Sequence, residues 1–435
     1  MRDAEVRYVE RDGNCLAFTV FGTGPVDLAI TQFRFPIDLM WELPQLAGFM
    51  EALGQMARVI AWDGRGYGAS DGVRYGESTV ETRADDFHTV LEAAGSERAT
   101  VFGMGAGPYG PLYAASYPER VRSLILVNLR PSLPELGQLS IRQCKKLAMS
   151  LRSPERLAFE NPRVAHDPVL QRWWGHAARL GNSPEDAARV IEFGAQVDFS
   201  SVLPTLRTPT LVMHRGDNRV WDIDTSRGAA AKLPEARFVE LPGSENDIFL
   251  GDTAPVLAEI ERFLREPETA ATHDRVLATV LFTDIVASTE QLAASGDDAW
   301  GRTLDAHDRT MDRLVASYRG RVVKSTGDGI LATFDGPARA VRCAAEMIDA
   351  AAQQGITLRA GLHTGEIEIR PTDVVGIAVH TANRISALAE PGEILVSRTV
   401  VDLTAGSGLE FQARGEHQLK GVPGTWPTFA AIPSS

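Results

Sequence analysis

The sequence contains few cysteines, fewer basic than acidic residues and no long apolar run. Its three cysteines, Cys15, Cys144 and Cys343, are far apart, which argues against a disulfide framework and predicts buried thiols in a reducing compartment. The 44 basic residues against 57 acidic ones give a net charge of -13, which argues against nucleic acid or an anionic membrane as a partner. No segment approaches the roughly 20 apolar residues that span a bilayer, and no signal-peptide core is present. These absences predict a soluble cytoplasmic protein.

The hydrophobic pattern changes along the 435 residues, a length that suits two or three domains. Up to residue 265, strand-like runs alternate with helical ones, as in a doubly wound, mostly parallel sheet with helices on both faces. Residues 131–203 interrupt this alternation with a mainly helical stretch, which we expect to form a lid over the sheet. The polar, proline-bearing stretch 266–275 is a predicted linker, so the predicted domains are 1–265 and 276–435. The predicted strands of the first domain are 28–31, 59–62, 99–102, 123–127, 211–214 and 238–241.

Two aspartates of the second domain lie where strand-like segments end. Asp284 closes the apolar run 280–285, and Asp328 stands in a Gly-Asp-Gly turn that predicts a hairpin over residues 322–334. Either aspartate alone is better explained as a helix cap or a turn residue. Together, at one edge of a sheet, two carboxylates can hold hard divalent cations.

The elements around these aspartates follow the order βαββαβ. One helix is predicted over 300–318, because apolar residues recur there at steps of three and four, and a second helix over 340–351. A further strand is predicted over 357–363. This order matches the ferredoxin-like split motif, so the second domain is predicted to be an α+β fold of that kind.

The first domain contains two motifs, DGRGYGASD and GMGAG, that resemble the α/β-hydrolase fold. In that fold the second motif carries the nucleophile, but its centre here is Gly105. The resemblance places Asn218 at the triad acid, with Asp217 one residue away as an alternative, and Asn246 at the histidine. An amide can neither accept the nucleophile's proton nor orient an imidazole as a carboxylate does. The first domain is therefore predicted to be a hydrolase scaffold without hydrolase chemistry.

Residues 105–110 also spell the GxGxxG pattern of a dinucleotide-binding turn. The pattern follows a middle strand rather than the first, and no acidic residue ends the next strand to hold a ribose. These glycines are therefore better explained by a tight turn and close helix packing. An unknown small molecule is still a candidate ligand for this domain.

From residue 276 onward, the sequence resembles the class III nucleotidyl cyclases over nearly the whole domain. The resemblance rests on five elements in the family's order: FTDIV at 282–286, KSTGD at 324–328, Asp373 with Gly376, Arg384, and LKG at 419–421. It implies cyclisation of a nucleoside triphosphate to a 3′,5′-cyclic monophosphate with release of pyrophosphate. It further implies that Asp284 and Asp328, with the carbonyl of Ile285, hold two divalent cations, Mg²⁺ or Mn²⁺. The implied phosphate cradle consists of Val286, Ala287, Ser288, Thr289 and Lys420.

The same resemblance assigns base recognition to Lys324 and Asp373. Adenine presents an acceptor at N1 and a donor at its amino group, and guanine presents the reverse. A lysine beside an aspartate therefore favours ATP over GTP, which predicts an adenylate cyclase. The alternative is that Lys324 only pairs with a nearby acid across the hairpin.

Arg384 and His380 lie four residues apart on a helix predicted over 380–388, so both point from one face. The resemblance implies that Arg384 stabilises charge on the α-phosphate, and that family usually has asparagine where this chain has His380. This histidine can donate a hydrogen bond or narrow the site and lower turnover.

Because the family combines metal carboxylates of one subunit with base and arginine groups of another, a homodimer is predicted. The alternatives are a catalytically weak nucleotide or small-molecule sensor and a hydrolase that uses Asp217.

Overall fold

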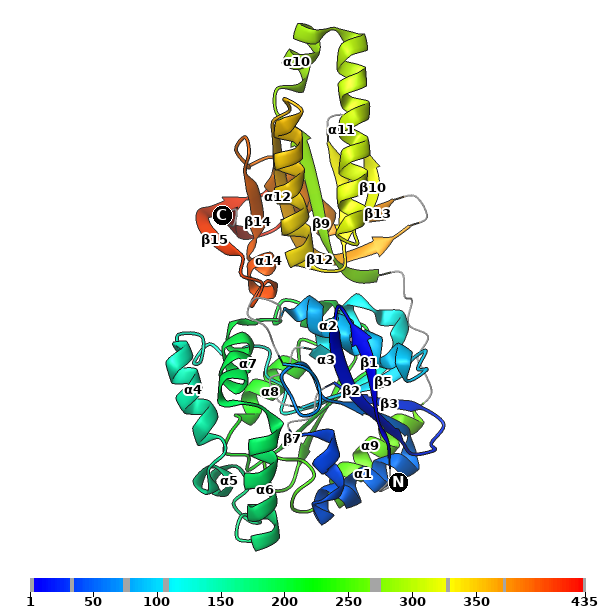
Figure 1. Cartoon of the computed structure of the whole chain (residues 1–435), viewed down its shortest axis with the longest axis vertical. Helices are drawn as coiled ribbons and strands as arrows, with labels where there is room; N and C mark the ends of the chain where they lie inside the picture. Colours follow the sequence, from blue (N-terminus) through cyan, green and yellow to red (C-terminus); the bar gives the residue numbers. More distant parts are fainter. Residues whose placement is uncertain are drawn as a thin grey trace. The chain divides into compact units, whose positions relative to one another are not determined.

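The chain is described by a computed structural model over residues 4–31, 35–72, 79–104, 109–266, 275–325, 329–370 and 373–432, without the side chains of residues 289, 293–295 and 297–299. It forms two compact units, Met1–Ala271 and Thr272–Ser435, each built on a sheet of its own (Figure 1). The boundary between them falls inside the stretch 266–275. None of the described helices combines the length and the apolarity needed to cross a bilayer.

The N-terminal unit is a doubly wound α/β sheet, as the alternation predicts. Its strands are β1 (Val6–Arg11), β2 (Asn14–Phe21), β3 (Asp27–Ile30), β4 (Arg58–Trp62), β5 (Ala99–Met104), β6 (Val121–Val127), β7 (Thr210–Arg215) and β8 (Ala236–Leu241). They lie in the order β1-β2-β4-β3-β5-β6-β7-β8, with β3 to β8 parallel. Helices flanking the sheet are α1 (Pro44–Met56), α2 (Val80–Ala93), α3 (Tyr109–Ser116), α8 (Ile223–Ala230) and α9 (Ala254–Arg265). The six predicted strands correspond to β3 to β8.

The stretch between β6 and β7 is mainly helical. It contains α4 (Ile141–Ser150), α5 (Pro154–Glu160), α6 (Pro168–Gly181) and α7 (Pro184–Gln196). The last three begin with proline behind a capping side chain that accepts a hydrogen bond from a backbone amide of the first turn, provided by Ser153, Asp167 and Ser183. Trp173 and Trp174 of α6 are buried in the same cluster as the apolar residues of the sheet. Helices α5 and α6 therefore share one core with the sheet, whereas α4 and α7 pack against each other.

Cys15 corrects the prediction of three buried thiols, because its side chain is exposed whereas Cys144 and Cys343 are buried. It lies at the start of β2 between the buried Asn14 and Leu16, and successive side chains of a strand point to opposite faces.

The C-terminal unit is an α+β fold whose first four strands have the predicted ferredoxin-like arrangement. Its strands are β9 (Arg275–Ile285), β10 (Arg321–Ser325), β11 (Ile330–Phe334), β12 (Leu358–Ile369), β13 (Val374–Val375), β14 (Ile394–Ser397), β15 (Glu410–Gln418) and β16 (Thr425–Ile432). Its helices are α10 (Ser288–Ser295), α11 (Asp297–Ser317), α12 (Pro337–Gln353), α13 (Ile377–Ser386) and α14 (Arg398–Leu403). The sheet order is β10-β11-β9-β12-β14-β16-β15, with β13 paired to β12. The order β12-β9-β11-β10 is the one that a split βαβ repeat produces.

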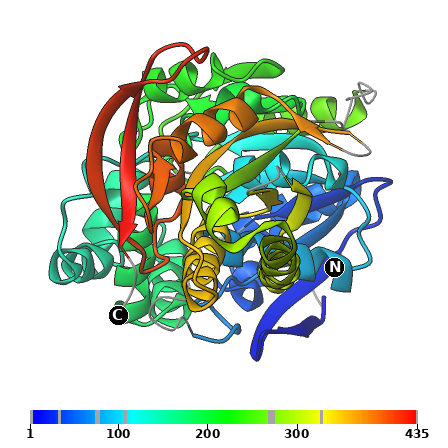
Figure 2. The same ribbon diagram turned by 90° about the horizontal axis from the view of Figure 1, so that it is seen from above.

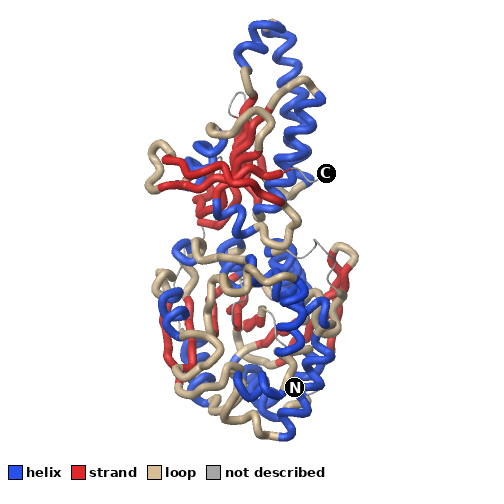
Figure 3. Tube along the Cα trace, turned by 90° about the vertical axis from the view of Figure 1, so that its left-hand side faces the viewer, coloured by secondary structure: helices blue, strands red, loops and turns tan. Residues whose placement is uncertain are grey.

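The two faces of this sheet are covered by different helices. Along β9, Leu281 and Ile285 join α11 and α12 in one apolar cluster, whereas Val280 and Phe282 join α13 in another. The helices α11 and α12 lie side by side (Figure 2), and the tube view shows helices packed beside the strands (Figure 3). The even-numbered residues of β9, including Asp284, consequently belong to the face that carries α13.

The single helix predicted between the first strand and the hairpin is wrong, because the structure has two. Gly296 separates α10 from α11 with a φ of +76°, a left-handed conformation that favours glycine and stops the first helix. The periodic apolar residues between 300 and 318 belong to the second of these helices, α11, and gave no indication of the first.

Candidate functional site

The sheet face under α13 brings together charged residues from two adjacent strands. In the antiparallel pairing of β9 with β12, Asp284 lies directly opposite Arg359, on the same face. Gly361 lets α13 approach this face closely, since a Cβ at that position would lie 2.1 Å from the backbone nitrogen of Ser386. The C-terminal end of α13 is thereby held against β12, close in the chain to Arg359.

Arg359 holds the carboxylate of Asp284. Its Nε donates to Asp284 Oδ2 at 2.7 Å, and its Nη2 donates to the same oxygen. The two side chains are 32% and 30% exposed, so the pair is open to solvent on one side. Asp284 Oδ1 accepts no hydrogen bond from the described residues. Sequence reasoning missed Arg359, although strand alternation over 357–363 would have placed it on this face.

The hairpin of β10 and β11 packs against the end of β9. A Cβ added at Gly329 would lie 1.9 Å from the carbonyl oxygen of Thr283, so only glycine fits there. The amide of Ile330 donates to Thr283 Oγ1 at 3.1 Å. Asp328, the predicted second metal ligand, lies outside the described residues. Among the described residues, no group of three or more His, Cys, Asp or Glu side chains gathers as it would around a metal ion.

Lys324 and Asp373 form an ion pair at the edge of the same face. The Nζ atom of Lys324 donates to Asp373 Oδ1 at 2.9 Å and to Oδ2 at 2.7 Å. This hydrogen bond, together with one from the amide of Val374, holds the pKa of the Asp373 carboxyl below its ordinary value. The two predicted base-reading residues thus lie in contact. This contact is expected both if the two residues bind the base together and if they only form an ion pair with each other.

The start of α10 differs in one respect from the predicted phosphate cradle. The amide of Val286 donates to the carbonyl of Thr357 at 2.8 Å, so this amide is occupied within the fold. Ala287 adopts a left-handed conformation with a φ of +55° and turns the chain into α10, which begins at Ser288. The side chain of Thr289 lies outside the described part, and the Ile285 side chain is buried in the core.

Helix α13 presents the remaining predicted residues to solvent. His380 and Arg384 are exposed, and no hydrogen bond or ion pair within the described residues involves His380. Arg384 Nε donates to the backbone carbonyl of Lys420 at 3.2 Å, which holds the exposed Lys420 segment beside the helix. No hydrogen bond or ion pair of the described residues joins Arg384 to Asp284 or to the Lys324 pair. Within the described part of the chain, Arg384 is therefore separate from the carboxylate of Asp284.

In the N-terminal unit, the two predicted triad loops meet. Asn218 Nδ2 donates to Asn246 Oδ1 at 3.3 Å, and Asn128 Nδ2 donates to the same oxygen at 3.4 Å and to the Asn246 carbonyl at 3.2 Å. Asn218 Oδ1 in turn accepts from the amides of Val220 and Trp221. Gly105 lies outside the described residues. Asp217 is 72% exposed and lies 3.8 Å from Arg163, and no hydrogen bond of the described residues joins its side chain to this amide cluster.

Two protein families match the chain, one over each unit. Residues 269–431 match the family described as adenylate and guanylate cyclase catalytic domain. Residues 41–253 match the family described as α/β hydrolase fold.

Individual relatives follow the same division. A putative adenylate cyclase of Rhizobium meliloti (strain 1021) is 31% identical over 157 residues, which cover 34% of this chain and 27% of that protein. A putative carbamate hydrolase of Caulobacter sp. (strain K31) is 29% identical over 201 residues, 43% of this chain and 73% of that protein. A solved hydrolase from Pseudomonas aeruginosa PA01 has the same fold as the N-terminal unit, with a TM-score of 0.51, 23% identity and coverage of 61% of this chain and 100% of its own. The chain spans only about a quarter of the cyclase relative's length.

Proposed function

Since the chain joins a catalytic domain of the adenylate and guanylate cyclase family to an α/β-hydrolase-like domain, we propose that it is an adenylate cyclase that converts ATP to 3′,5′-cyclic AMP and pyrophosphate. The choice of ATP rests on the donor and the acceptor that Lys324 and Asp373 offer side by side, on the sheet face that also carries Asp284.

The pair suits adenine because each member offers what one edge of that base needs. The ammonium of Lys324 has three N–H groups and can donate to adenine N1 while it stays bonded to Asp373. The carboxylate of Asp373 can accept from the adenine amino group. Guanine would present an N–H to the ammonium and a carbonyl oxygen to the carboxylate, leaving both edges without a partner. ATP is therefore the proposed substrate and GTP the rejected one.

Asp284 is the proposed metal ligand of the described residues. A half-exposed carboxylate with one oxygen open suits a hard divalent cation, Mg²⁺ or Mn²⁺. Such a cation, when bound, would supply Lewis-acid activation of the 3′-hydroxyl and the triphosphate. Arg359 orients this carboxylate, and its own charge can turn to a triphosphate oxygen. Arg384 supplies the donor for charge on the α-phosphate, beside the Lys420 segment.

A second copy of the chain would complete the site. Ile377, the first residue of α13, and Leu388, two residues beyond its end, are 53% and 41% exposed, and the exposed His380 and Arg384 lie between them in the chain. Exposed apolar side chains on either side of catalytic ones suggest an interface at which one protomer's Arg384 serves the other's carboxylates. A homodimer with two shared sites is the proposed assembly.

A heterodimer of two inactive chains tests this arrangement. Asp284→Asn and Arg384→Ala chains with different tags are co-expressed and purified through both tags, and cyclic nucleotide formation is measured with ATP. One of the two sites then contains both substitutions and the other contains neither, so activity of about half the wild-type value is expected. Doubly tagged dimers of Asp284→Asn chains alone are the inactive control. A silent heterodimer would show that the carboxylate and the arginine act within one chain.

The activity itself is tested by incubating the full-length protein with ATP and GTP in parallel, with Mg²⁺ and with Mn²⁺. Cyclic AMP from ATP alone is the expected product. A protein that binds ATP tightly but forms no product with either metal would instead be a nucleotide sensor.

For the N-terminal unit we propose a regulatory or stabilising role without hydrolysis, because amides occupy the acid and histidine positions and bond to each other.

A further inference from the structure

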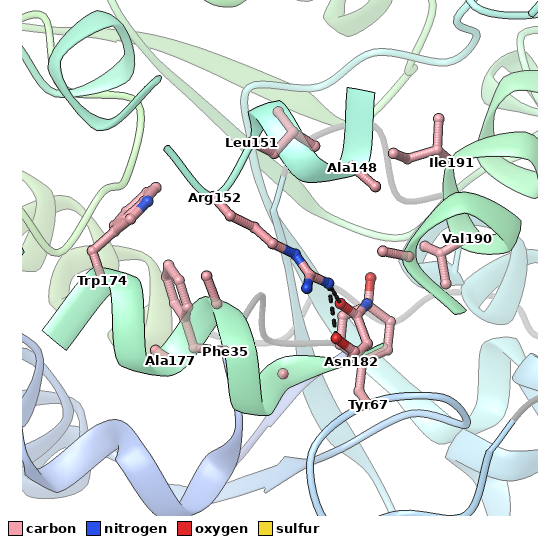
Figure 4. A pocket seen from close by; sticks show the side chains of 13 residues that line it. Phe35, Tyr67, Ala148, Leu151, Arg152, Trp174, Ala177, Asn182, Val190 and Ile191 are labelled. Atoms are coloured by element: carbon pink, nitrogen blue, oxygen red, sulfur yellow. Dashed lines mark hydrogen bonds between the residues drawn. The ribbon is translucent and has the colours of Figure 1, made fainter. Parts of the chain in front are cut away.

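A cavity of about 160 Å³ lies among the helices between β6 and β7 in the N-terminal unit, and it shares no lining residue with the Asn218–Asn246 cluster. Its walls are mainly apolar and come from the segment after β3, the end of α4, and the helices α6 and α7 (Figure 4). They include Phe35, Leu151, Trp174, Ala177, Val190 and Ile191. A cavity of this size and polarity suits a ligand of a few carbons rather than water alone.

One cation enters this apolar space. Arg152 extends into the cavity, and its guanidinium lies next to Asn182, with Trp174 and Phe35 on the other side (Figure 4). Its Nη2 donates to the Asn182 carbonyl at 2.8 Å, to Asn182 Oδ1 at 2.7 Å and to the Ser183 carbonyl at 3.4 Å. Its Nε and Nη1 donate to none of the described residues, and none of their carboxylates forms an ion pair with it. Burial lowers the pKa of Arg152, since the cavity solvates a lone cation poorly.

We propose that this cavity binds a small monocarboxylate with an apolar body, whose carboxylate accepts hydrogen bonds from Nη1 of Arg152 while its carbons pack against Trp174, Val190 and Ile191. Asn182 and Ser183 fix the guanidinium from one side, so its free edge is oriented before the anion arrives. A cavity of about 150 Å³ holds one benzene molecule, which sets the body of the ligand at roughly six carbons, in a ring or a chain. No cleavage of the ligand is implied, and the inference is independent of cyclase activity.

Calorimetric titration of the full-length protein with benzoate and with hexanoate tests the site. Both are expected to bind saturably, and benzyl alcohol and 1-hexanol, which have similar bodies without the charge, to bind about 10- to 100-fold more weakly. Equal affinity for the alcohols would overturn the proposal, as would a lack of saturable binding by both carboxylates. The same titration is carried out with acetate and with inorganic phosphate. Tight binding of either would show that the site binds a small anion without an apolar body, and would overturn the proposal.

Two variants distinguish the contribution of the Arg152 charge to ligand binding from that of the cavity volume. Arg152→Gln should weaken benzoate binding by about 10- to 100-fold, and Ala178→Leu, which fills the half-buried lining without touching the charge, should weaken it similarly. Arg172→Gln, an exposed position of α6 outside the lining, is the matched control and should bind as the wild type does. If Arg152→Gln fails to fold by circular dichroism, Ala178→Leu still decides, because unchanged affinity there would place the ligand elsewhere.

Discussion

The two units treat the polar residues of their sites in opposite ways. In the N-terminal unit, Asn218 and Asn246 bond to each other, so neutral groups satisfy one another within the fold. In the C-terminal unit, Asp284 and Lys324 form partly exposed ion pairs with Arg359 and Asp373. Exposed ion pairs contribute only about 0–1 kcal/mol to stability, so one partner can be exchanged for a metal or a nucleotide at little loss. The contrast agrees with the proposal that the second unit carries out the chemistry and the first has a regulatory or stabilising role.

The largest effect is expected from Asp284→Asn. Loss of the carboxylate should lower cyclic AMP formation by at least about 100-fold, because a neutral amide is a poor ligand for a hard cation. The protein should stay folded, since the side chain is 30% exposed. The control is Asp312→Asn at an exposed position of α11, which should keep full activity. Equal activity of both variants would show that Asp284, at the end of β9, is not a ligand of a metal ion needed for catalysis.

A buried histidine makes the C-terminal unit sensitive to acid. His363 bonds to Ser397 Oγ at 2.8 Å, and burial lowers its pKa from 6.5 to about 4. A depressed pKa means that the unfolded chain takes up the proton first, so stability present above pH 6.5 is lost as the pH falls toward 4. The loss should approach about 3 kcal/mol.

Scanning calorimetry of the full chain at neutral and acid pH checks this. The His363→Gln variant should lose most of the acid shift in the transition of the C-terminal unit, whereas His417→Gln on β15 should keep it. An unchanged acid shift in His363→Gln would show that other groups control the pH dependence.

Base selection is the next effect. Lys324→Gln should lower the preference for ATP over GTP by about 10- to 100-fold, because the amide can offer either a donor or an acceptor to the base. The preference is measured as the ratio of kcat/KM for the two nucleotides. Arg321→Gln, exposed on the same strand, is the matched control. A variant that loses turnover with both nucleotides equally would show that Lys324 supports the site without reading the base.

His380→Asn tests the position at which the resemblance to the cyclases predicts asparagine. The smaller amide should raise kcat by about two- to tenfold if the imidazole misplaces the ribose, because small shifts in a reacting group change rates by such factors. His380 is exposed, so the substitution should leave the melting temperature unchanged. A fall in kcat at unchanged KM would instead show that the histidine itself makes a needed hydrogen bond.

The smallest effect is expected in the amide cluster. Asn246→Ala removes the shared acceptor of Asn218 and Asn128 and should lower the free energy of unfolding of the N-terminal unit by about 1 kcal/mol. Cyclic AMP formation should not change. If it does, the N-terminal unit has a closer role in cyclisation than the comparison suggests.

Sequence reasoning predicted most of the fold because periodicity and turn residues carry that information locally. The strands β3 to β8 and the split order around the hairpin follow from apolar runs of the right length. The extra helix α10 was missed because its eight residues show too little apolar period and end at a glycine. The contact between Lys324 and Asp373 agrees with their shared assignment, although the roles proposed for them await the experiments above.

What the sequence determined by itself is the chemical identity of each position, including the amides of Asn218 and Asn246 in the first unit and the charged groups of Asp284, Lys324 and Arg384 in the second. What only the tertiary structure decided is which of these groups touch. The partnership of Arg359 with Asp284 depends on the register of two strands separated by 75 residues in the chain. The place of the Arg152 guanidinium in an apolar cavity depends on how α4, α6 and α7 pack around it. Hydrophobic periodicity fixes the face of a residue within its own element, but contacts between elements arise from packing that no local pattern encodes.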